Sequence, residues 1–326
     1  MPHSGILGLG LHVPEKRLTN SDLEKMVDTS DAWIVERTGI RERRIVSDHM
    51  ASSDLGEHAA RQAIEDAGLK PEDIDLIVLS TITPDMLFPA TACFLQTKLG
   101  AFNAAAFDVS AACSGFVYAL TVADSFIRAG RSRNALVVGT EVLSKFTDYQ
   151  DRRSCILFGD GAGAVVLGQT GGRREILYTH LGADGRGAVH MMLPGGGSKH
   201  PASPDTLAAR LHYMKINGRE VFEFAVKKMR DLIADAMEKC SLRAADVALV
   251  VPHQVNYRII ESACKKIEVG LDRVYLNIDR YGNTSSASVP IALCEAVRDG
   301  RLKPGDVVIL VAFGAGLTWG SAVIRW

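Results

Sequence analysis

The sequence predicts an α/β fold in which short apolar strands alternate with helices. Continuous runs of leucine and β-branched residues, such as residues 76–79, are typical of strands that are covered by helices on both faces. Segments with apolar residues at helical spacing, such as residues 53–67, lie between these runs. The chain has 326 residues, 47% of them hydrophobic, which is enough for two domains or one large one.

The expected elements follow in chain order. Ser21-Asp22-Leu23-Glu24 matches a capping box that opens a helix reaching residue 27. A second short helix is expected over residues 30–37, before Gly39, and a third over residues 53–67, before Gly68. The apolar runs predict strands at residues 74–79, 105–109, 135–138, 164–167, 247–251 and 307–311.

A weak internal repeat divides the chain. The first half contains "PEDIDLIVLS", then "NALVVGTEV" and "GAGAVVLG"; the second contains "AADVALVVPHQVN", then "GDVVILVAFGAG" and "GSAVIRW". We therefore expect two similar halves, residues 1–170 and 171–326, joined at the turn-rich residues 169–172.

Composition excludes several classes of protein. The net charge of −1 and the pI near 6.8 give no bulk attraction to nucleic acid or to an anionic membrane. No apolar run reaches the roughly 18 residues of a membrane span, and the N-terminus has no signal-peptide pattern. The six cysteines are scattered, without a CxxC pair or zinc spacing, so we expect a reducing cytoplasm and no metal site.

Cys113 is the first candidate for chemistry. It lies in "AAAFDVSAACSGFVYAL", which reads as a strand, a tight turn and the start of a helix. Backbone N–H groups and the helix dipole at such a position favour a thiolate. A small residue that packs a tight turn explains the same pattern equally well.

Two further polar segments follow buried runs. His253 lies in "LVVPHQVN", just past an expected strand, where ligands of open α/β sheets gather. Asn283 lies in "DRYGNTSSASVP", before an expected helix. Taken alone, His253 is explained as a surface loop residue and Asn283 as part of a helix cap.

The last candidate is the glycine-rich loop in "AFGAGLTWGSAVIRW". Its free N–H groups could bind an oxyanion, although a plain hairpin also carries glycine. The chain has no dinucleotide fingerprint, phosphate loop, HExxH motif or GxSxG elbow.

Together, and in this order, the segments "DVSAACSGF", "PHQVN", "YGNTSSAS" and "FGAGLTWGSA" resemble β-ketoacyl-acyl-carrier-protein synthase III of type II fatty acid synthesis. The resemblance extends from "TSDAWIVERTGIRERR" through "DRRSCILFGDGAGAVVLG" and covers essentially the whole chain. It implies a thiolase fold, two pseudo-equivalent halves in a five-layer αβαβα arrangement, and a homodimer.

The resemblance also implies a mechanism without a metal or organic cofactor. Cys113 would take a starter acyl group from acyl-CoA. His253 and Asn283 would promote decarboxylation of malonyl-acyl-carrier protein, whose carbanion attacks the acyl-cysteine. The backbone N–H groups of Cys113 and Ala315 would form an oxyanion hole.

Other roles are implied residue by residue. Trp33 and Arg152 would sandwich the adenine of coenzyme A, with Thr29 and Arg37 nearby. The residues expected along the pantetheine tunnel are Phe158, Gly218, Phe222 and Asn256. Phe88, supplied by the partner subunit, would close the acyl pocket and favour a short starter such as acetyl.

A basic cluster formed by Arg258, Lys265 and Lys266 would dock the acidic carrier protein, although an ordinary solvated helix face explains it too. The chain departs from the family pattern at Ala315, where a third glycine is usual and a methyl group is expected to narrow the acyl pocket or strain the turn. It also departs at Glu223, where the family can carry a basic residue.

Two alternatives stay open at this point. One is a related condensing or acyl-transfer enzyme of secondary metabolism that uses a different starter. The other is a non-catalytic acyl-binding partner protein, against which the intact set of Cys113, His253 and Asn283 argues.

Overall fold

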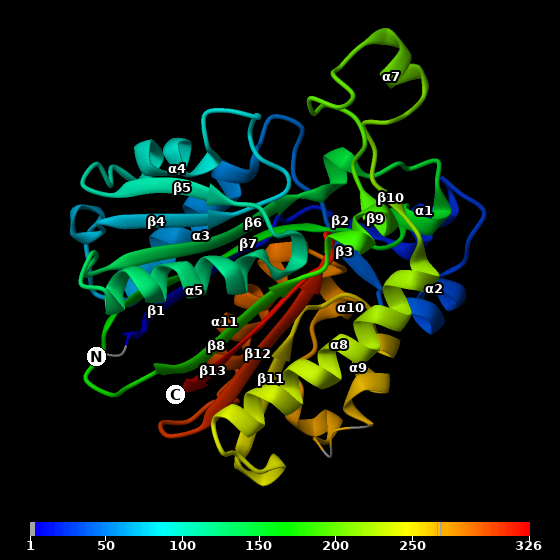
Figure 1. Ribbon diagram of the computed structural model, residues 1–326. Helices are drawn as coiled ribbons and strands as arrows, with labels where there is room; N and C mark the ends of the chain where they lie inside the picture. The colour runs from blue at the N-terminus through cyan, green and yellow to red at the C-terminus, as the bar shows by residue number, and fades with distance from the viewer. Residues whose placement is uncertain (1–3, 266, 268) are drawn as a thin grey trace.

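The central feature of the computed structural model, which describes residues 4–265, 267 and 269–326, is a mixed nine-stranded sheet (Figure 1). The strands lie in the order β11-β12-β13-β8-β1-β7-β6-β4-β5. Their bounds are β1 (Ser4–His12), β4 (Leu76–Ser80), β5 (Ala105–Val109), β6 (Ala135–Val142), β7 (Asp160–Gln169), β8 (Glu175–Ala183), β11 (Val247–Pro252), β12 (Val307–Gly314) and β13 (Thr318–Arg325).

The sheet consists of two parts with the same internal order. In the first part β5, β4 and β6 are parallel, and β7 and β1 follow antiparallel. In the second part β11 and β12 are parallel, β13 and β8 follow antiparallel, and Val274 adds a parallel bridge outside β11. One residue pair, Gly5 with Glu175, joins β1 to β8. The fold therefore repeats itself, whereas a boundary between residues 170 and 171 stays a prediction.

Helices cover both parts and fill the space between them. The longer ones are α3 (Ser52–Asp66), α4 (Thr91–Leu99), α5 (Gly115–Arg128), α8 (Gly218–Lys239), α9 (Tyr257–Cys264) and α11 (Ser288–Arg298). One core packs α3 and α4 on β4, β6 and β7; a second packs α5 and α11 between the two parts; a third packs α8 and α9 on β11, β12 and β13. These layers give the αβαβα arrangement and confirm the predicted fold class (Figure 1).

Local sequence signals predicted the ends of most of the expected helices to within one or two residues of their observed positions. The second helix, α2 (Asp31–Thr38), begins after the cap Ser30 and ends at Gly39, which has a φ of 81°. The first prediction was displaced, because α1 (Asn20–Glu24) is capped by Thr19. The Thr19 N–H donates to Asp22 Oδ2 and the Asp22 N–H donates to Thr19 Oγ1, so the capping box starts two residues earlier than expected.

Short elements border the sheet near one end of the strands. β9 (Met191–Met192) pairs with β10 (Lys215–Ile216), and α7 (Pro204–Ala208) projects from the body between them (Figure 1). The remaining short elements are β2 (Arg17–Thr19), β3 (Glu42–Arg44), α6 (Arg152–Cys155) and α10 (Ile278–Tyr281). Within the part of the chain that the structure describes, no helix has both the length and the apolarity to cross a membrane.

Candidate active site

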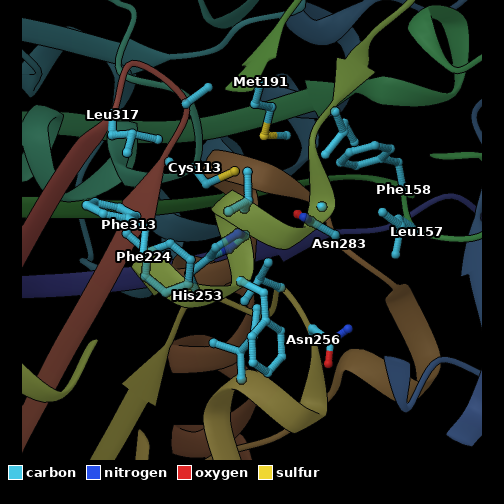
Figure 2. Close-up of a pocket in the computed structure, with 18 residues that line it drawn as sticks. Cys113, Leu157, Phe158, Met191, Phe224, His253, Asn256, Asn283, Phe313 and Leu317 are labelled. Carbon is cyan, nitrogen blue, oxygen red and sulfur yellow. The ribbon is translucent and has the colours of Figure 1, made fainter. Parts of the chain in front are cut away.

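A largely apolar pocket lies where segments from both halves meet, and Cys113, His253 and Asn283 point into it (Figure 2). The three residues follow β5, β11 and α10 respectively. The pocket is lined by Cys113, Leu157, Phe158, Met191, Ile216, Gly218, Val221, Phe222, Phe224, His253, Val255, Asn256, Ile259, Asn283, Phe313, Gly314, Ala315 and Leu317. The fold thus brings together the three residues that the sequence placed in separate segments.

Cys113 lies two residues before the helix start at which the sequence analysis placed it. It belongs to a 3-10 turn, η2 (Ala112–Ser114), and α5 begins two residues later at Gly115. Its thiol is buried, and burial raises its pKa to about 12. Proximity to a helix start therefore does not by itself favour a thiolate here, because the desolvation of the thiol outweighs it.

His253 is fully buried rather than a surface loop residue. Its Nδ1 lies 2.7 Å from Ser288 Oγ, while its Nε2 has no hydrogen-bond partner among the described residues. The ring lies edge-on to Phe313, with centroids 5.8 Å apart. Burial lowers the pKa of His253 to about 3, so the imidazole is neutral at physiological pH.

Asn283 is oriented by its neighbours. The Ser285 N–H donates to Asn283 Oδ1 at 2.8 Å, which leaves the Nδ2 amide as the group available to a ligand. The Asn283 backbone is held on both sides, because its N–H donates to Leu157 O at 2.8 Å and its C=O accepts from Gly159 N at 3.1 Å. The segment is therefore more than a helix cap.

The glycine-rich loop is the turn of the β12–β13 hairpin and reaches Cys113. A Cβ on Gly314 would stand 2.6 Å from the Cys113 backbone N, so only glycine allows this approach. The loop residue with positive φ is Gly316, at 135°. Ala315 is not among the residues with positive φ, so the expected strain of the turn by its methyl group is wrong. A narrowing of the acyl pocket by that methyl group stays a prediction.

The expected tunnel residues line the same pocket. Phe158, Gly218, Phe222 and Asn256 all line it, and Phe222 is partly exposed. Asn256 Nδ2 donates to the Arg37 carbonyl at 3.0 Å, which ties the start of α9 to α2. The lining residue Asn256 therefore borders the helix that carries Trp33.

Trp33, Arg37, Arg152 and Thr29 lie outside the pocket lining. The guanidinium carbons of Arg37 and Arg152 lie 4.8 and 5.3 Å from the centroid of the Trp33 ring. Trp33 is only partly buried and packs beside a small core around Ile34, so it is not an ordinary core residue. The Thr29 hydroxyl is buried and has no hydrogen-bond partner among the described residues.

The remaining expected residues are on the surface. Phe88 is 84% exposed, and it lines neither the pocket that contains Cys113 nor the apolar cavity that adjoins this pocket. Arg258 pairs with Glu36 at 3.5 Å and Lys265 with Glu261 at 3.3 Å. Lys266 lies outside the described residues.

A shallow groove between α8 and α9 carries both charge signs. It is lined by Phe222, Glu223, Val226, Lys227, Arg230, Ser262 and Lys265. Glu223 therefore borders the basic residues, and it pairs with Arg219 at 3.4 Å.

The groups that hold His253 and Asn283 were not among the residues expected from the sequence. The Ser288 side chain contacts the His253 ring and the Ser285 backbone N–H donates to Asn283, yet the run "NTSSAS" suggested helix capping. Phe313 and a second apolar cavity were also missed. That cavity adjoins the pocket at Met191 and Ala315 and is lined by Ile82, Thr83, Ala112, Phe146, Met191, Met192, Leu193, Met214 and Ala315.

The site contains groups for covalent acyl chemistry, and the described residues hold no cluster of three or more His, Cys, Asp or Glu side chains placed to bind a metal. A thiol, a neutral imidazole and an amide converge in an apolar pocket. Such a set can form a thioester and donate two hydrogen bonds to a developing oxyanion.

Comparison with known proteins points to one family. Residues 107–185 match the model of 3-oxoacyl-[acyl-carrier-protein] synthase III, and residues 237–326 match the model of its C-terminal part. The chain is 54% identical over 323 residues to the beta-ketoacyl-[acyl-carrier-protein] synthase III of Caldanaerobacter subterraneus subsp. tengcongensis, covering 99% of this chain and 98% of the relative.

Two solved structures of the same enzyme agree. That of 3-oxoacyl-[acyl-carrier-protein] synthase III from Aquifex aeolicus superimposes with a TM-score of 0.91 at 44% identity, covering 99% of this chain and 100% of that one. The Thermus thermophilus structure gives a TM-score of 0.92 at 44% identity and covers 99% of both chains.

Proposed function

The chain belongs to the 3-oxoacyl-[acyl-carrier-protein] synthase III family and is an acyltransferase of the condensing type, and we propose that its substrates are an acyl-CoA and malonyl-acyl-carrier protein. The reaction is the initiating condensation of fatty acid synthesis. The observation that carries the assignment of roles is the convergence of Cys113, His253 and Asn283 in one apolar pocket (Figure 2).

In the first step Cys113 attacks the acyl-CoA carbonyl and becomes an acyl thioester as coenzyme A leaves. The backbone N–H groups of Cys113 and Ala315 stabilise the tetrahedral oxyanion in this proposal. The close approach of Gly314 to the Cys113 amide supports it, because it brings the hairpin loop beside the thiol. Covalent attachment splits a difficult condensation into two easier steps.

In the second step malonyl-acyl-carrier protein loses CO₂, and the resulting carbanion attacks the acyl-cysteine. His253 Nε2–H and Asn283 Nδ2–H donate to the thioester oxygen as the enolate forms. The Ser288 hydroxyl, which also accepts from the Gln254 N–H at 3.4 Å, would donate to Nδ1 and keep the ring proton on Nε2. Decarboxylation supplies the electron pair, so the step needs neither a metal nor an organic cofactor.

The outer residues would bind the coenzyme and the carrier protein. Trp33 and Arg152 would take the adenine between them, with Arg37 and Thr29 beside it, and the buried unpartnered Thr29 hydroxyl is a group that a ligand could satisfy. Pantetheine would pass Phe222, Gly218, Asn256 and Phe158. Arg258 and Lys265, with Lys266, would steer the acidic carrier protein.

A homodimer is part of the proposal. Met86, Leu87 and Phe88 are 48%, 80% and 84% exposed, an unusual run of apolar side chains for a free surface. In a dimer, Phe88 would close the partner's acyl pocket and favour a short starter, with acetyl as the expected one. Sedimentation of wild type against Phe88→Asp tests this, and a wild-type monomer at micromolar concentration contradicts it.

The deciding experiment is intact-protein mass spectrometry after mixing with a panel of acyl-CoAs, followed by malonyl-acyl-carrier protein. An acetyl adduct on Cys113, discharged as acetoacetyl product, is the expected result. Adducts from longer or branched acyl-CoAs alone would instead indicate the secondary-metabolism enzyme, which the relatives do not favour. Absence of any adduct would indicate a non-catalytic protein.

A further inference from the structure

Glu141 is a buried carboxylate that the steps above do not use. It lies on β6 and is 0% exposed. Its Oε2 accepts from Thr83 Oγ1 at 2.8 Å, Ile82 N at 3.1 Å and Thr81 Oγ1 at 3.2 Å, and its Oε1 accepts from Ser286 Oγ at 2.7 Å. A carboxylate is costly to bury unless its surroundings compensate for it, so these donors give Glu141 a fixed place.

The donor on Oε1 comes from a different part of the chain from the other three. Residues 81–83 follow β4, the neighbour of β6, whereas Ser286 lies in the turn η7 (Ser285–Ala287) before α11. The Ser286 hydroxyl also lies 3.1 Å from the Ser80 carbonyl, but it has one proton to donate, and the shorter contact with the carboxylate takes it. Glu141 therefore links the sheet to a turn 145 residues later in the chain.

The turn η7 lies directly on β6. A Cβ on Gly139 would stand 2.6 Å from the Ser286 carbonyl oxygen, so only glycine allows this approach. Successive residues of a strand face opposite sides of the sheet, so Gly139 and Glu141, two positions apart, face the same side, which η7 covers. The close packing and the hydrogen bond therefore act on the same residue of the turn.

Within the described part of the chain, Ser286 makes the side-chain hydrogen bond that ties η7 to the sheet. The Ala287 N–H donates to the Thr284 carbonyl and the Ser288 N–H to the Ser285 carbonyl, so these two bonds stay within the turn. The Ser285 hydroxyl has no hydrogen-bond partner among the described residues. The position of the turn on the sheet thus depends on the contacts of Ser286.

The conformation of Ser285 needs such support. Its φ of 49° lies in the left-handed region, which a residue with a side chain adopts at a cost and keeps only where its surroundings hold it. The same residue orients Asn283, because the Ser285 N–H donates to Asn283 Oδ1 at 2.8 Å. Release of the turn would turn this N–H away and leave Asn283 Nδ2 without a fixed direction.

The other end of the turn leads to the second hydrogen-bond donor of the pocket. Ser288 follows η7 directly and begins α11, and its Oγ lies 2.7 Å from His253 Nδ1. Ser286 is therefore placed between the group that orients Asn283 and the group that contacts His253. A shift of η7 on the sheet would displace both groups together.

We propose that Glu141 is a positioning residue for the decarboxylation step. Through the Ser286 hydroxyl it holds η7 on the sheet, and η7 in turn sets the directions of Asn283 Nδ2 and His253 Nε2. Acylation of Cys113 relies instead on backbone N–H groups of η2 and of the β12–β13 turn, neither of which belongs to η7. The inference rests on the function proposed above, because it assigns a role within one of that function's two steps.

The test compares two partial reactions in Ser286→Ala and wild type. Acyl transfer to Cys113 from the acyl-CoA that wild type accepts is followed by intact-protein mass spectrometry, and CO₂ release is measured with malonyl-acyl-carrier protein. We expect CO₂ release to slow by at least about fivefold, since a displacement of about 1 Å in a catalytic group can cost about 100-fold in rate. Acylation should stay close to the wild-type rate. A role in stability alone would lower the temperature of unfolding and leave the ratio of the two rates unchanged.

Ser144→Ala is the matched control. The Ser144 hydroxyl also donates to a buried carboxylate, Asp160 Oδ2, at 2.6 Å, but it contacts neither Asn283 nor His253. Its removal therefore costs the same kind of hydrogen bond without displacing η7. Both partial reactions of this variant should keep the wild-type rates.

Two substitutions of Glu141 complete the test. Glu141→Ala should repeat the effect of Ser286→Ala, which removes one hydroxyl and decides the matter even if Glu141→Ala does not fold. Glu141→Gln should recover most of the lost rate. Its amide oxygen can still accept from residues 81–83, and its NH₂ group can donate to Ser286, whose own proton then goes to the Ser80 carbonyl.

The outcomes separate this inference from the proposed function. Wild-type CO₂ release by Ser286→Ala overturns the positioning role, and so does an equal fall of both partial reactions. A Glu141→Gln enzyme as slow as Glu141→Ala overturns it too, because the charge and not the hydrogen-bonded position would then matter. A wild-type protein that neither becomes acylated nor releases CO₂ overturns the proposed function itself, and this inference with it.

Discussion

The floor of the pocket and the exposed surface outside its lining, which we call the rim, are held in different ways. Cys113, His253 and Asn283 on the floor are each at most 3% exposed, and hydroxyl and backbone groups orient the two hydrogen-bond donors. The rim side chains of Arg152, Arg258 and Lys265 are at least half exposed and are held by ion pairs with Asp28, Glu36 and Glu261. Such exposed pairs contribute about 0–1 kcal/mol and are screened by salt.

This difference implies a division of labour. A buried group is fixed before substrate arrives, so replacing it changes the rate of a chemical step. An exposed charged group is adaptable, so replacing it changes binding of a large partner. Substitutions at the floor and at the rim should therefore differ in which kinetic constant they alter.

The largest effect is expected for Cys113→Ala. Without the sulfur no acyl-enzyme forms, so condensation should fall by more than about 1,000-fold while the fold persists. Intact mass measurement with acetyl-CoA and a product assay check this, and thermal unfolding confirms folding. An acyl adduct on the variant would place the nucleophile elsewhere.

His253→Ala and Asn283→Ala should separate the two steps. Each removes one donor to the enolate oxygen, so CO₂ release from malonyl-acyl-carrier protein should slow by about 100- to 1,000-fold. Acylation of Cys113 should stay within a few-fold of wild type. Rapid decarboxylation by the double variant would contradict the assignment.

The pH dependence of CO₂ release sharpens the role of His253. Its pKa is lowered from 6.5 to about 3, so the neutral, hydrogen-bonding form is present throughout pH 5–8. We expect no loss of decarboxylation rate attributable to this residue until the pH falls toward 3. A rate that instead follows an ionisation near pH 6.5 would show that the imidazole is not desolvated as described.

A smaller effect is expected for Trp33→Ala at the rim. Loss of an aromatic surface beside Arg152 should raise KM for acyl-CoA by about 3- to 30-fold, which corresponds to about 0.5–2 kcal/mol. The turnover number at saturating acyl-CoA should be unchanged. A fall in turnover number with KM constant would move Trp33 from coenzyme binding to the chemistry.

The smallest effect is expected for Arg258→Ala. It should raise KM for malonyl-acyl-carrier protein by about 2- to 5-fold at low salt, and the difference should shrink as salt is added. Arg243→Ala, which removes an exposed arginine paired with Asp246, is the matched control and should change nothing. Equal effects of both variants would argue against a docking role for α9.

The sequence located the elements well where local signals are strong. Residues 105–109 form β5 as predicted, and Ser30 and Gly39 mark the start and end of α2. The capping box of α1 was misplaced by two residues, because Thr19 offers the same hydroxyl and makes the reciprocal bonds. The seven-residue run "GNTSSAS" was read as a cap, since its tertiary partners, Glu141 and His253, are remote in sequence.

By itself, the sequence determined the fold class, the family resemblance and the three residues at the centre of the pocket. These follow from local patterns and from the order of distinctive segments. The tertiary structure alone decided that His253 is buried and neutral, that Cys113 lies in a 3-10 turn with a raised pKa, and that Glu141 is buried and accepts from the Thr83 and Ser286 hydroxyls. The physical reason is desolvation: a pKa depends on what packs around a group from every side, and those neighbours come from distant parts of the chain.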